Sequence, residues 1–176
     1  KNVIDECAGL GVPSMLFSWR GEPTIYSSKD KKGNVVRFPD VLSYARRKGI
    51  LEVSALSNGQ LMDRDLIEAI VDAAPSWISF SIDGLEANYN KIRAPRVKQG
   101  KGYNSFGQVV SNIKSLVSYR DSKGKNVPQV RSNTIFPPIA NNPHAYYKFM
   151  KNIGVGWVTV NELLDFRGDK LPDEAI

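Results

Sequence analysis

Residues 50–84 read ILEVSALSNGQLMDRDLIEAIVDAAPSWISFSIDG, and this stretch decides the fold class. It opens with an apolar run over 50–56, which predicts a buried strand, and closes with a second such run over 76–82. Between them, residues 64–73 carry apolar side chains at helical spacing, and Asp63 precedes them as an N-cap. Strand, helix and strand in this order predict one β-α-β unit with two parallel strands.

The same alternation continues on both sides of this unit. Further strands are expected over residues 12–18, 129–136 and 155–164, and further helices over 3–10, 38–48, 105–119 and 144–152. A polar insertion occupies 27–36, and a long loop rich in Gly, Lys and Arg occupies 85–104. Five strands that alternate with helices predict a parallel α/β domain. The pattern alone leaves a doubly wound sheet and a barrel both open.

Composition and charge narrow the function classes. The 176 residues suit one domain, and a formal net charge of +6 permits anionic partners without requiring nucleic acid. No apolar run reaches the roughly 18 residues of a membrane helix, and the first residues lack an apolar signal core. A cytoplasmic protein without a membrane partner is therefore expected. Cys7 is the only cysteine, which excludes a disulfide framework and an iron–sulfur or zinc site built from this chain's thiolates alone.

The carboxyl ends of the expected strands are consistently polar. Barrels and doubly wound sheets both bind their ligands at this end of the strands. The polar residues that follow the five strands are Arg20, Gly21, Glu22, Ser57, Asn58, Ser81, Asp83, Asn133, Thr134, Asn161 and Glu162. Contact with water explains one polar strand end. Carboxylate, amide and hydroxyl groups at all five ends predict a ligand site.

Four residues after the first expected strand carry a family resemblance. Arg20-Gly21-Glu22-Pro23 resembles the Gly-Gly-Glu-Pro-type motif of radical S-adenosylmethionine (radical SAM) enzymes, with Arg20 in place of the first glycine. In that family the motif receives the amino group in the methionine part of S-adenosylmethionine (SAM). Carbonyl oxygens left free by Gly and Pro, together with a carboxylate, suit this task because an ammonium group has only donors.

Three later motifs follow in the order of the same family. Ser57-Asn58-Gly59 resembles the Thr-Asn-Gly that ends the third barrel strand, and residues 78–84 resemble the Ser-x-Asp-Gly that ends the fourth. Residues 89–93, Tyr-Asn-Lys-Ile-Arg, resemble a motif of members with a C-terminal SPASM extension, a module for auxiliary clusters. The SAM-binding residues that the resemblance implies are Gly21, Glu22, Pro23, Ser57, Asn58, Ser81, Asp83, Arg93 and Asn133.

The resemblance also implies a role for each part of this set. Glu22 anchors the amino group of SAM, and Arg93 pairs with its carboxylate. Ser81 and Asp83 face the ribose or the carboxylate. The last two strands flank the adenine with residues 133–135 and 158–161. No residue of the chain is assigned as a catalytic acid, a base or a metal ligand.

A fold and two cofactors follow from the resemblance as well. Residues 1–176 are expected to be an incomplete core domain, a partial (β/α)6 TIM-like barrel of the radical SAM type, truncated at both ends. The first strand and the Cys-x3-Cys-x2-Cys cluster loop are expected before Lys1, and the SPASM region after Ile176. SAM and a [4Fe–4S] cluster are the implied cofactors. The chain by itself is expected to be inactive, because it lacks the three cysteines.

The activity implied for the parent enzyme is one-electron cleavage of SAM to a 5′-deoxyadenosyl radical that abstracts hydrogen from a substrate. A peptide or protein substrate is expected, with a small metabolite or a sugar as the competitor, and flavodoxin or ferredoxin as the electron donor. The rival interpretation is a non-catalytic α/β-barrel binding domain for an anionic partner. The basic clusters within 29–37 and 91–101 are either solvated loops or docking positions for an anion. His144 is expected to be a cap or solvated.

Overall fold

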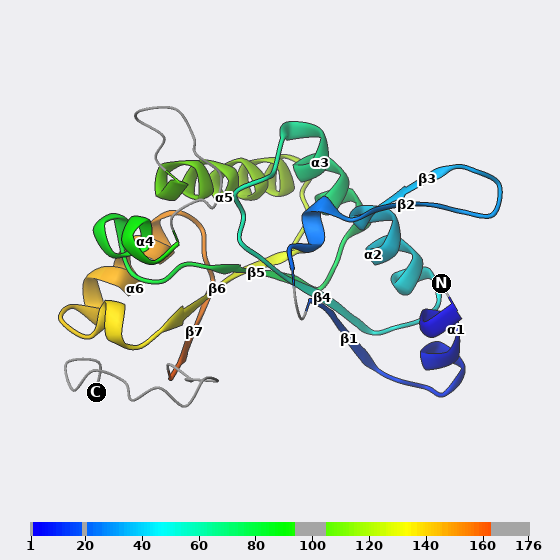
Figure 1. The fold of residues 1–176 in the computed structure, drawn as a ribbon, viewed down its shortest axis with the longest axis horizontal. Helices are drawn as coiled ribbons and strands as arrows, with labels where there is room; N and C mark the ends of the chain where they lie inside the picture. The colour runs from blue at the N-terminus through cyan, green and yellow to red at the C-terminus, as the bar shows by residue number, and fades with distance from the viewer. Residues whose placement is uncertain (1, 19–20, 94–104, 163–176) are drawn as a thin grey trace.

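A five-stranded parallel sheet forms the centre of the computed structural model, which describes residues 2–18, 21–93 and 105–162. The strands are β1 (Ser14–Phe17), β4 (Glu52–Ser57), β5 (Trp77–Ser81), β6 (Gln129–Ile135) and β7 (Trp157–Asn161). They follow one another across the sheet in chain order (Figure 1). Because this order has no reversal, the sheet is singly wound, and the doubly wound alternative left open by the sequence is excluded.

Five helices occupy the segments in which the sequence predicts them. They are α1 (Asn2–Gly9), α2 (Phe38–Arg47), α3 (Arg64–Ala73), α5 (Ser105–Ser122) and α6 (Pro143–Asn152). Asp63 caps α3 by accepting a hydrogen bond from the backbone N–H of Leu66 at 2.8 Å. Asn142, rather than the exposed His144, caps α6. No helix within the described ranges has the length and hydropathy that crossing a bilayer requires.

One further helix lies where the sequence predicts only a loop. Helix α4 (Glu86–Ile92) is short and has no side-chain N-cap, so its local sequence signal is weak. Its stability comes from tertiary contacts, because Tyr89 is fully buried and its ring lies 5.5 Å from that of Phe106. The rest of the expected loop, residues 94–104, lies outside the described residues.

The segment between β1 and α2 folds into a one-turn helix and then a hairpin, which takes up the polar insertion. The 3₁₀ helix η1 (Pro23–Ile25) precedes the antiparallel strands β2 (Ser27–Lys29) and β3 (Val35–Arg37). Asp30 holds the hairpin turn, since its Oδ1 atom accepts hydrogen bonds from the backbone N–H groups of Lys32 and Asn34. A second 3₁₀ helix, η2 (Pro137–Ile139), follows β6.

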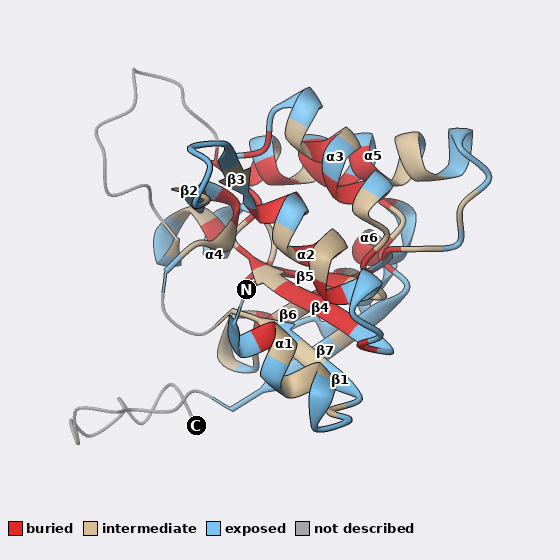
Figure 2. Ribbon diagram, turned by 90° about the vertical axis from the view of Figure 1, so that its right-hand side faces the viewer, coloured by how far each residue is buried: buried red, intermediate tan, exposed pale blue. Residues whose placement is uncertain are grey.

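The hydrophobic core lies between the sheet and a row of helices. Figure 1 shows α2, α3 and α5 side by side over the same side of the sheet, and α2 contacts α3 as α3 contacts α5. Figure 2 shows buried residues gathered where β4 and β5 meet these helices. The side chains of Ile78 and Phe80 point into this core, and because a strand alternates its faces, Trp77, Ser79 and Ser81 point to the other side. We call that other side the uncovered face; it carries exposed side chains, among them Leu16 and Trp157.

Candidate functional site

Glu22 connects the ends of the first two strands of the sheet. It stands at the N-cap of η1, where its Oε1 atom accepts hydrogen bonds from the Thr24 backbone N–H at 3.2 Å and the Thr24 hydroxyl at 2.7 Å. The same oxygen accepts a bond of 2.7 Å from the hydroxyl of Ser57, and Oε2 accepts one of 2.7 Å from the backbone N–H of Asn58. Residues predicted separately from two motifs, about 35 positions apart, therefore meet at one carboxylate.

The turn 57–59 that receives Glu22 is itself tightly held. The Ser57 hydroxyl accepts a bond from the Gly59 backbone N–H, and the Asn58 side chain accepts one from the backbone N–H of Gln60. From the helix layer, the Asn112 side chain donates to the Gly59 carbonyl oxygen at 2.7 Å. Hydrogen bonds within the turn and from helix α5 hold residues 57–59 in place. The Glu22 carboxylate is therefore bound to a rigid segment.

The acceptor capacity that remains here can be counted. A carboxylate oxygen accepts about two hydrogen bonds. Oε1 of Glu22 already has three donors, whereas Oε2 has one and retains room for another. The Pro23 carbonyl accepts one bond, from the Tyr26 backbone N–H, so one of its two acceptor positions is used. The Gly21 carbonyl accepts no backbone bond within the described residues, and at φ +96° Gly21 adopts a conformation that favours glycine.

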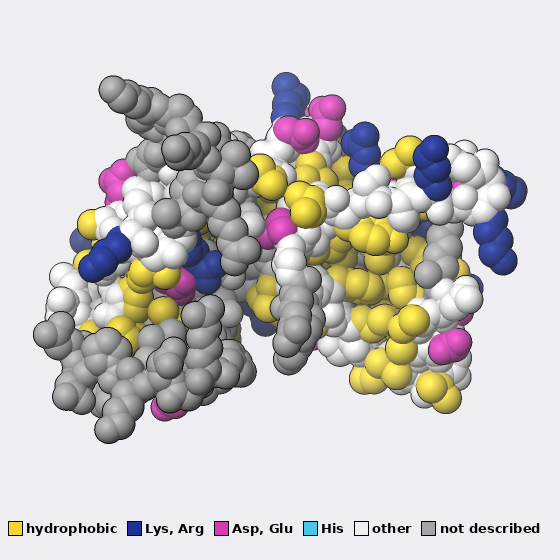
Figure 3. Space-filling model, in the orientation of Figure 1, with side chains coloured by type: hydrophobic (Ala, Val, Ile, Leu, Met, Phe, Trp, Pro, Cys, Tyr) yellow, Lys and Arg dark blue, Asp and Glu magenta, His cyan; other side chains and the backbone are white. Residues whose placement is uncertain are grey.

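A cavity of about 1140 Å³ opens beside Gly21, Glu22 and Pro23. It is bounded by β1, η1, the β2–β3 hairpin and α2, and Figure 3 shows hydrophobic side chains gathered below the hairpin. Three side chains of the basic cluster line it, Lys29, Lys31 and Lys32, and no ion pair involves them in the described part of the chain. The fourth, Arg37, is not among the lining residues. The cavity lining is therefore mostly apolar, and its charged side chains are these three lysines together with Glu22, Asp30 and Asp40.

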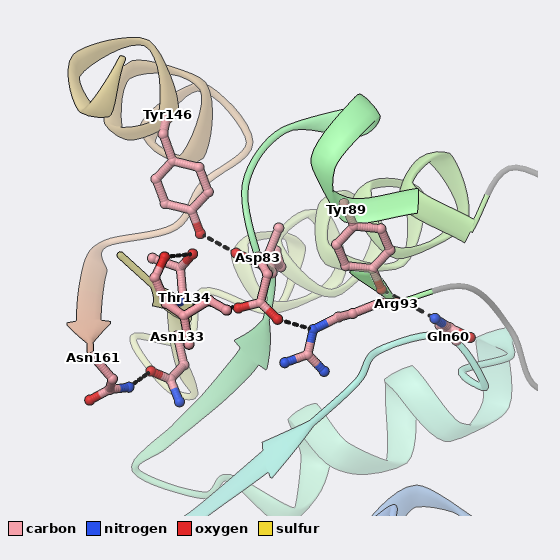
Figure 4. A network of polar contacts seen from close by, with 10 residues as sticks. Gln60, Asp83, Tyr89, Arg93, Asn133, Thr134, Tyr146 and Asn161 are labelled. Carbon is pink, nitrogen blue, oxygen red and sulfur yellow. Dashed lines mark hydrogen bonds and ion pairs between the residues drawn. The ribbon is translucent and has the colours of Figure 1, made fainter. Parts of the chain in front are cut away.

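A second polar group lies at the ends of β5 and β6 (Figure 4). The Asp83 side chain is only 5% exposed, and its Oδ2 atom lies 2.5 Å from Nε of Arg93, whose side chain is 34% exposed. The other oxygen, Oδ1, accepts a bond of 3.1 Å from the Ile135 backbone N–H. Asp83 thus joins the end of α4 to β6. Arg93 uses its Nε atom in this contact, and its two terminal nitrogens make no hydrogen bond within the described residues.

The sheet register places Ser81 directly beside Asn133 on the uncovered face. Asn133 accepts a hydrogen bond from the side chain of Asn161 in β7. Thr134 differs from the prediction, because it is buried on the helix side of the sheet, whereas the neighbouring Asn133 is partly exposed. Glu162 is exposed, and Arg20 lies outside the described residues.

One contact bridges the two polar groups, and no sequence motif predicted it. The Gln60 side chain, two residues beyond Asn58, donates to the hydroxyl of Tyr89 at 3.2 Å, and Tyr89 belongs to the same helix that leads to Arg93 (Figure 4). The predicted residues therefore lie in two linked groups along the carboxyl edge of the sheet. Sequence reasoning also missed Thr24, which bonds Glu22 through both its backbone and its side chain.

Tyr146 supports the second group from the helix layer. Its hydroxyl donates to the carbonyl oxygen of Ile82 at 2.7 Å (Figure 4). The same hydroxyl lies 3.3 Å from the hydroxyl of Ser132. Burial of this phenol raises its pKa to about 12, and the nearby charge of Asp83 acts in the same direction. The neutral phenol therefore fixes the end of β5 immediately before Asp83.

This raised pKa predicts a loss of stability at alkaline pH. The stabilising effect of a neutral Tyr146 is complete below the unfolded-state pKa of 10.0 and is lost as the pH rises toward about 12. Tyr146→Phe is expected to cost about 1 kcal/mol at pH 8 and to reduce the fall in unfolding free energy between pH 9.5 and about 11.5. Urea unfolding at several pH values measures both. Tyr147→Phe, at an exposed position, serves as the control, and equal slopes for the two variants contradict the assignment.

Cys7 does not contribute to either group. It lies half-buried in α1 as a free thiol. Within the described residues, no three or more His, Cys, Asp or Glu side chains come together as metal ligands. The residues that the structure describes therefore offer no iron–sulfur site of the kind that the resemblance implies.

Comparisons with known proteins give relatives and a fold. No family model matches the chain. It is 36% identical over 93 residues, 53% of its length, to Fe-coproporphyrin III synthase of Methanosarcina barkeri (strain Fusaro / DSM 804), of which it covers 21%. It is 22% identical over 180 residues, 97% of its length, to the tungsten-containing aldehyde ferredoxin oxidoreductase cofactor-modifying protein of Pyrococcus furiosus, of which it covers 44%. The chain thus spans less than half the length of these relatives.

Solved structures share the architecture. Native anSMEcpe with bound AdoMet and Cp18Cys peptide superposes with a TM-score of 0.63 at 18% identity, over 92% of this chain and 41% of that chain. The same protein with bound AdoMet and Kp18Cys peptide gives a TM-score of 0.64 at 17% identity. At this identity the likeness establishes the fold, an α/β arrangement around a mostly parallel sheet.

Proposed function

Because this chain belongs to the radical SAM superfamily, we propose that its two polar groups bind SAM at the carboxyl edge of a partial (β/α)6 barrel. The observation that carries this proposal is the Glu22 carboxylate, which joins two sequence motifs and keeps an open acceptor position on Oε2. The whole parent protein would use SAM as its source of a 5′-deoxyadenosyl radical that abstracts hydrogen from a substrate.

The described residues fit SAM in three ways. Oε2 of Glu22 and the Gly21 carbonyl can accept from its ammonium group. The terminal nitrogens of Arg93, oriented by Asp83, can donate to its carboxylate in a charge-assisted pair. Ser81 and Asn133, on the uncovered face, can hydrogen-bond its ribose or adenine. These residues orient the cofactor and hold its charges, while SAM supplies the chemistry.

The second cofactor does not fit the residues described here. A [4Fe–4S] cluster of this kind requires three thiolates, and the chain has one cysteine, held in α1. Ligands from other residues of the parent protein would complete the site, and an electron donor such as flavodoxin or ferredoxin would reduce the cluster. Because solved proteins of this fold bind a peptide beside AdoMet, a peptide or protein is the substrate class that we propose.

Glu22→Gln tests the proposal in the full-length protein. Loss of one charge-assisted contact is expected to weaken SAM binding by about 2 kcal/mol, or roughly 30-fold, as measured by calorimetry. Glu52→Gln is the matched control, because Glu52 lies at the opposite end of β4 and, among the described residues, its side chain accepts a bond from the exposed Ser14 hydroxyl alone. Thr24→Val removes a donor to Glu22 but keeps the carboxylate, so it separates support of the turn from contact with SAM. An unchanged dissociation constant in Glu22→Gln would falsify the assignment.

A second function has one specific observation in its favour. Lys29, Lys31 and Lys32 in the cavity lining suit an anionic partner, as expected for a non-catalytic binding domain, although Glu22, Asp30 and Asp40 line the same cavity. Binding of an anionic peptide to the full-length protein, with no measurable affinity for SAM, would favour this function over the first.

A further inference from the structure

Arg131 is held between two tryptophan rings on the uncovered face of the sheet. Its guanidinium carbon lies 4.5 Å from the ring centroid of Trp77 and 5.8 Å from that of Trp157. The register places Trp157 of β7 directly beside Arg131 of β6, and Trp77 comes from β5 on the other side. All three side chains stand on strands, so the cation has a fixed position with aromatic faces on both sides.

No carboxylate of the described residues forms an ion pair with Arg131. In the described part of the chain its one side-chain acceptor is Oε1 of Gln129, at 3.3 Å from Nη2. Its Nε atom is buried without an acceptor, and so is the indole nitrogen of the neighbouring Trp77. A buried donor without an acceptor is costly, and a cation without a counter-ion more so. Two such donors in one cluster indicate that an acceptor from elsewhere belongs here.

The cluster lies within reach of the proposed SAM site. Arg131 and Asn133 are two residues apart on β6, so their side chains share a face and their positions differ by about 7 Å along the strand. Ser79 and Ser81 occupy the matching positions on β5, and the uncovered face between them is lined by small hydroxyl groups. A ligand that reaches from the Asn133 level toward the amino end of the strands therefore meets Arg131.

We propose that Arg131, Trp77 and Trp157 form an oxyanion subsite that binds a carboxylate or phosphate of the substrate; the identification of this ligand as the substrate rests on the proposed function. The planar guanidinium is always charged and presents paired donors to such groups. The charge-assisted bond replaces the long, neutral contact with Gln129. Trp157 is 61% exposed and offers a flat apolar surface to the organic part of the same ligand.

Small aromatic anions test this subsite. Sodium benzoate and phenyl phosphate are titrated at constant ionic strength while tryptophan fluorescence is recorded, with neutral benzamide as the third probe. Saturable binding of at least one anion, absence of binding by benzamide, and at least tenfold weaker binding by Arg131→Gln are expected. The anion that binds more tightly identifies carboxylate or phosphate as the preferred group. Benzamide binding equal to that of the anions, or equal anion affinity in Arg131→Gln, overturns the proposal.

Two further variants show whether weaker anion binding by Arg131→Gln comes from loss of the subsite, from the change in net charge or from misfolding. Arg47→Gln removes the same charge from α2, where Arg47 bonds Ser43, and is expected to bind the anions like the unmodified chain. Arg131→Lys keeps the charge without the planar fork and is expected to retain part of the affinity. SAM affinity is measured on the same samples. A protein that binds SAM but neither anion refutes the subsite alone, whereas one that binds the anions but not SAM refutes the proposed function and leaves the subsite supported.

Discussion

Asp83→Ala is expected to lower the free energy of unfolding by about 3–4 kcal/mol. The carboxylate is almost fully buried and has two partners, Nε of Arg93 and the backbone N–H of Ile135. Its removal leaves a cation and a backbone donor unpaired between α4 and β6. The loss is at the lower end of the range for buried pairs because the Arg93 side chain remains 34% exposed and can reach water. Urea unfolding followed by circular dichroism measures the change.

Asp72→Ala is the matched control for this variant. Asp72 also forms an ion pair, with Nζ of Lys125 at 2.7 Å, but the Asp72 side chain is 55% exposed. Exposed pairs contribute about 0–1 kcal/mol, so this substitution is expected to have a small effect. Lys125 lowers the pKa of Asp72, so the contribution of this pair is present near neutral pH and is lost as the pH falls through that lowered pKa. Equal losses in the two variants at pH 7 would show that burial of Asp83 is not what matters.

Gly59→Ala is expected to cost about 3–4 kcal/mol as well. Gly59 has φ +69°, and a Cβ atom added there would lie 2.7 Å from a ring carbon of Phe80. Phe80 is fully buried in the core and has no space to move away. The penalty therefore combines left-handed backbone strain with overpacking, and the displaced turn would also disturb the Ser57–Glu22 contact.

Gly49→Ala separates these two causes. Gly49 has φ +91°, but a Cβ atom there meets nothing within 4 Å. Only the conformational part, about 1–2 kcal/mol, is expected to remain. Thermal unfolding of the two variants under identical conditions gives the comparison. If Gly49→Ala destabilises the protein as much as Gly59→Ala, close packing against Phe80 contributes nothing.

Local sequence signals were sufficient for most of the secondary structure. The apolar runs over 50–56 and 76–82 predicted β4 and β5, and Asp63 marked the start of α3. Such features depend on a residue and its near neighbours, so they can be recognised without the fold. Helix α4 could not, because it depends on burial of Tyr89 against a residue of another helix.

The sequence by itself determined the alternation of strands and helices and the order of the polar motifs along one edge of the sheet. Only the tertiary structure decided how those motifs interact: Glu22 bonds Ser57 and Asn58, Arg93 bonds Asp83, and Arg131 lies between two indole rings. The reason is physical. Periodicity and capping act over a few residues, whereas a hydrogen bond between residues 35 positions apart depends on the sheet register, the turn geometry and the close packing of the whole core.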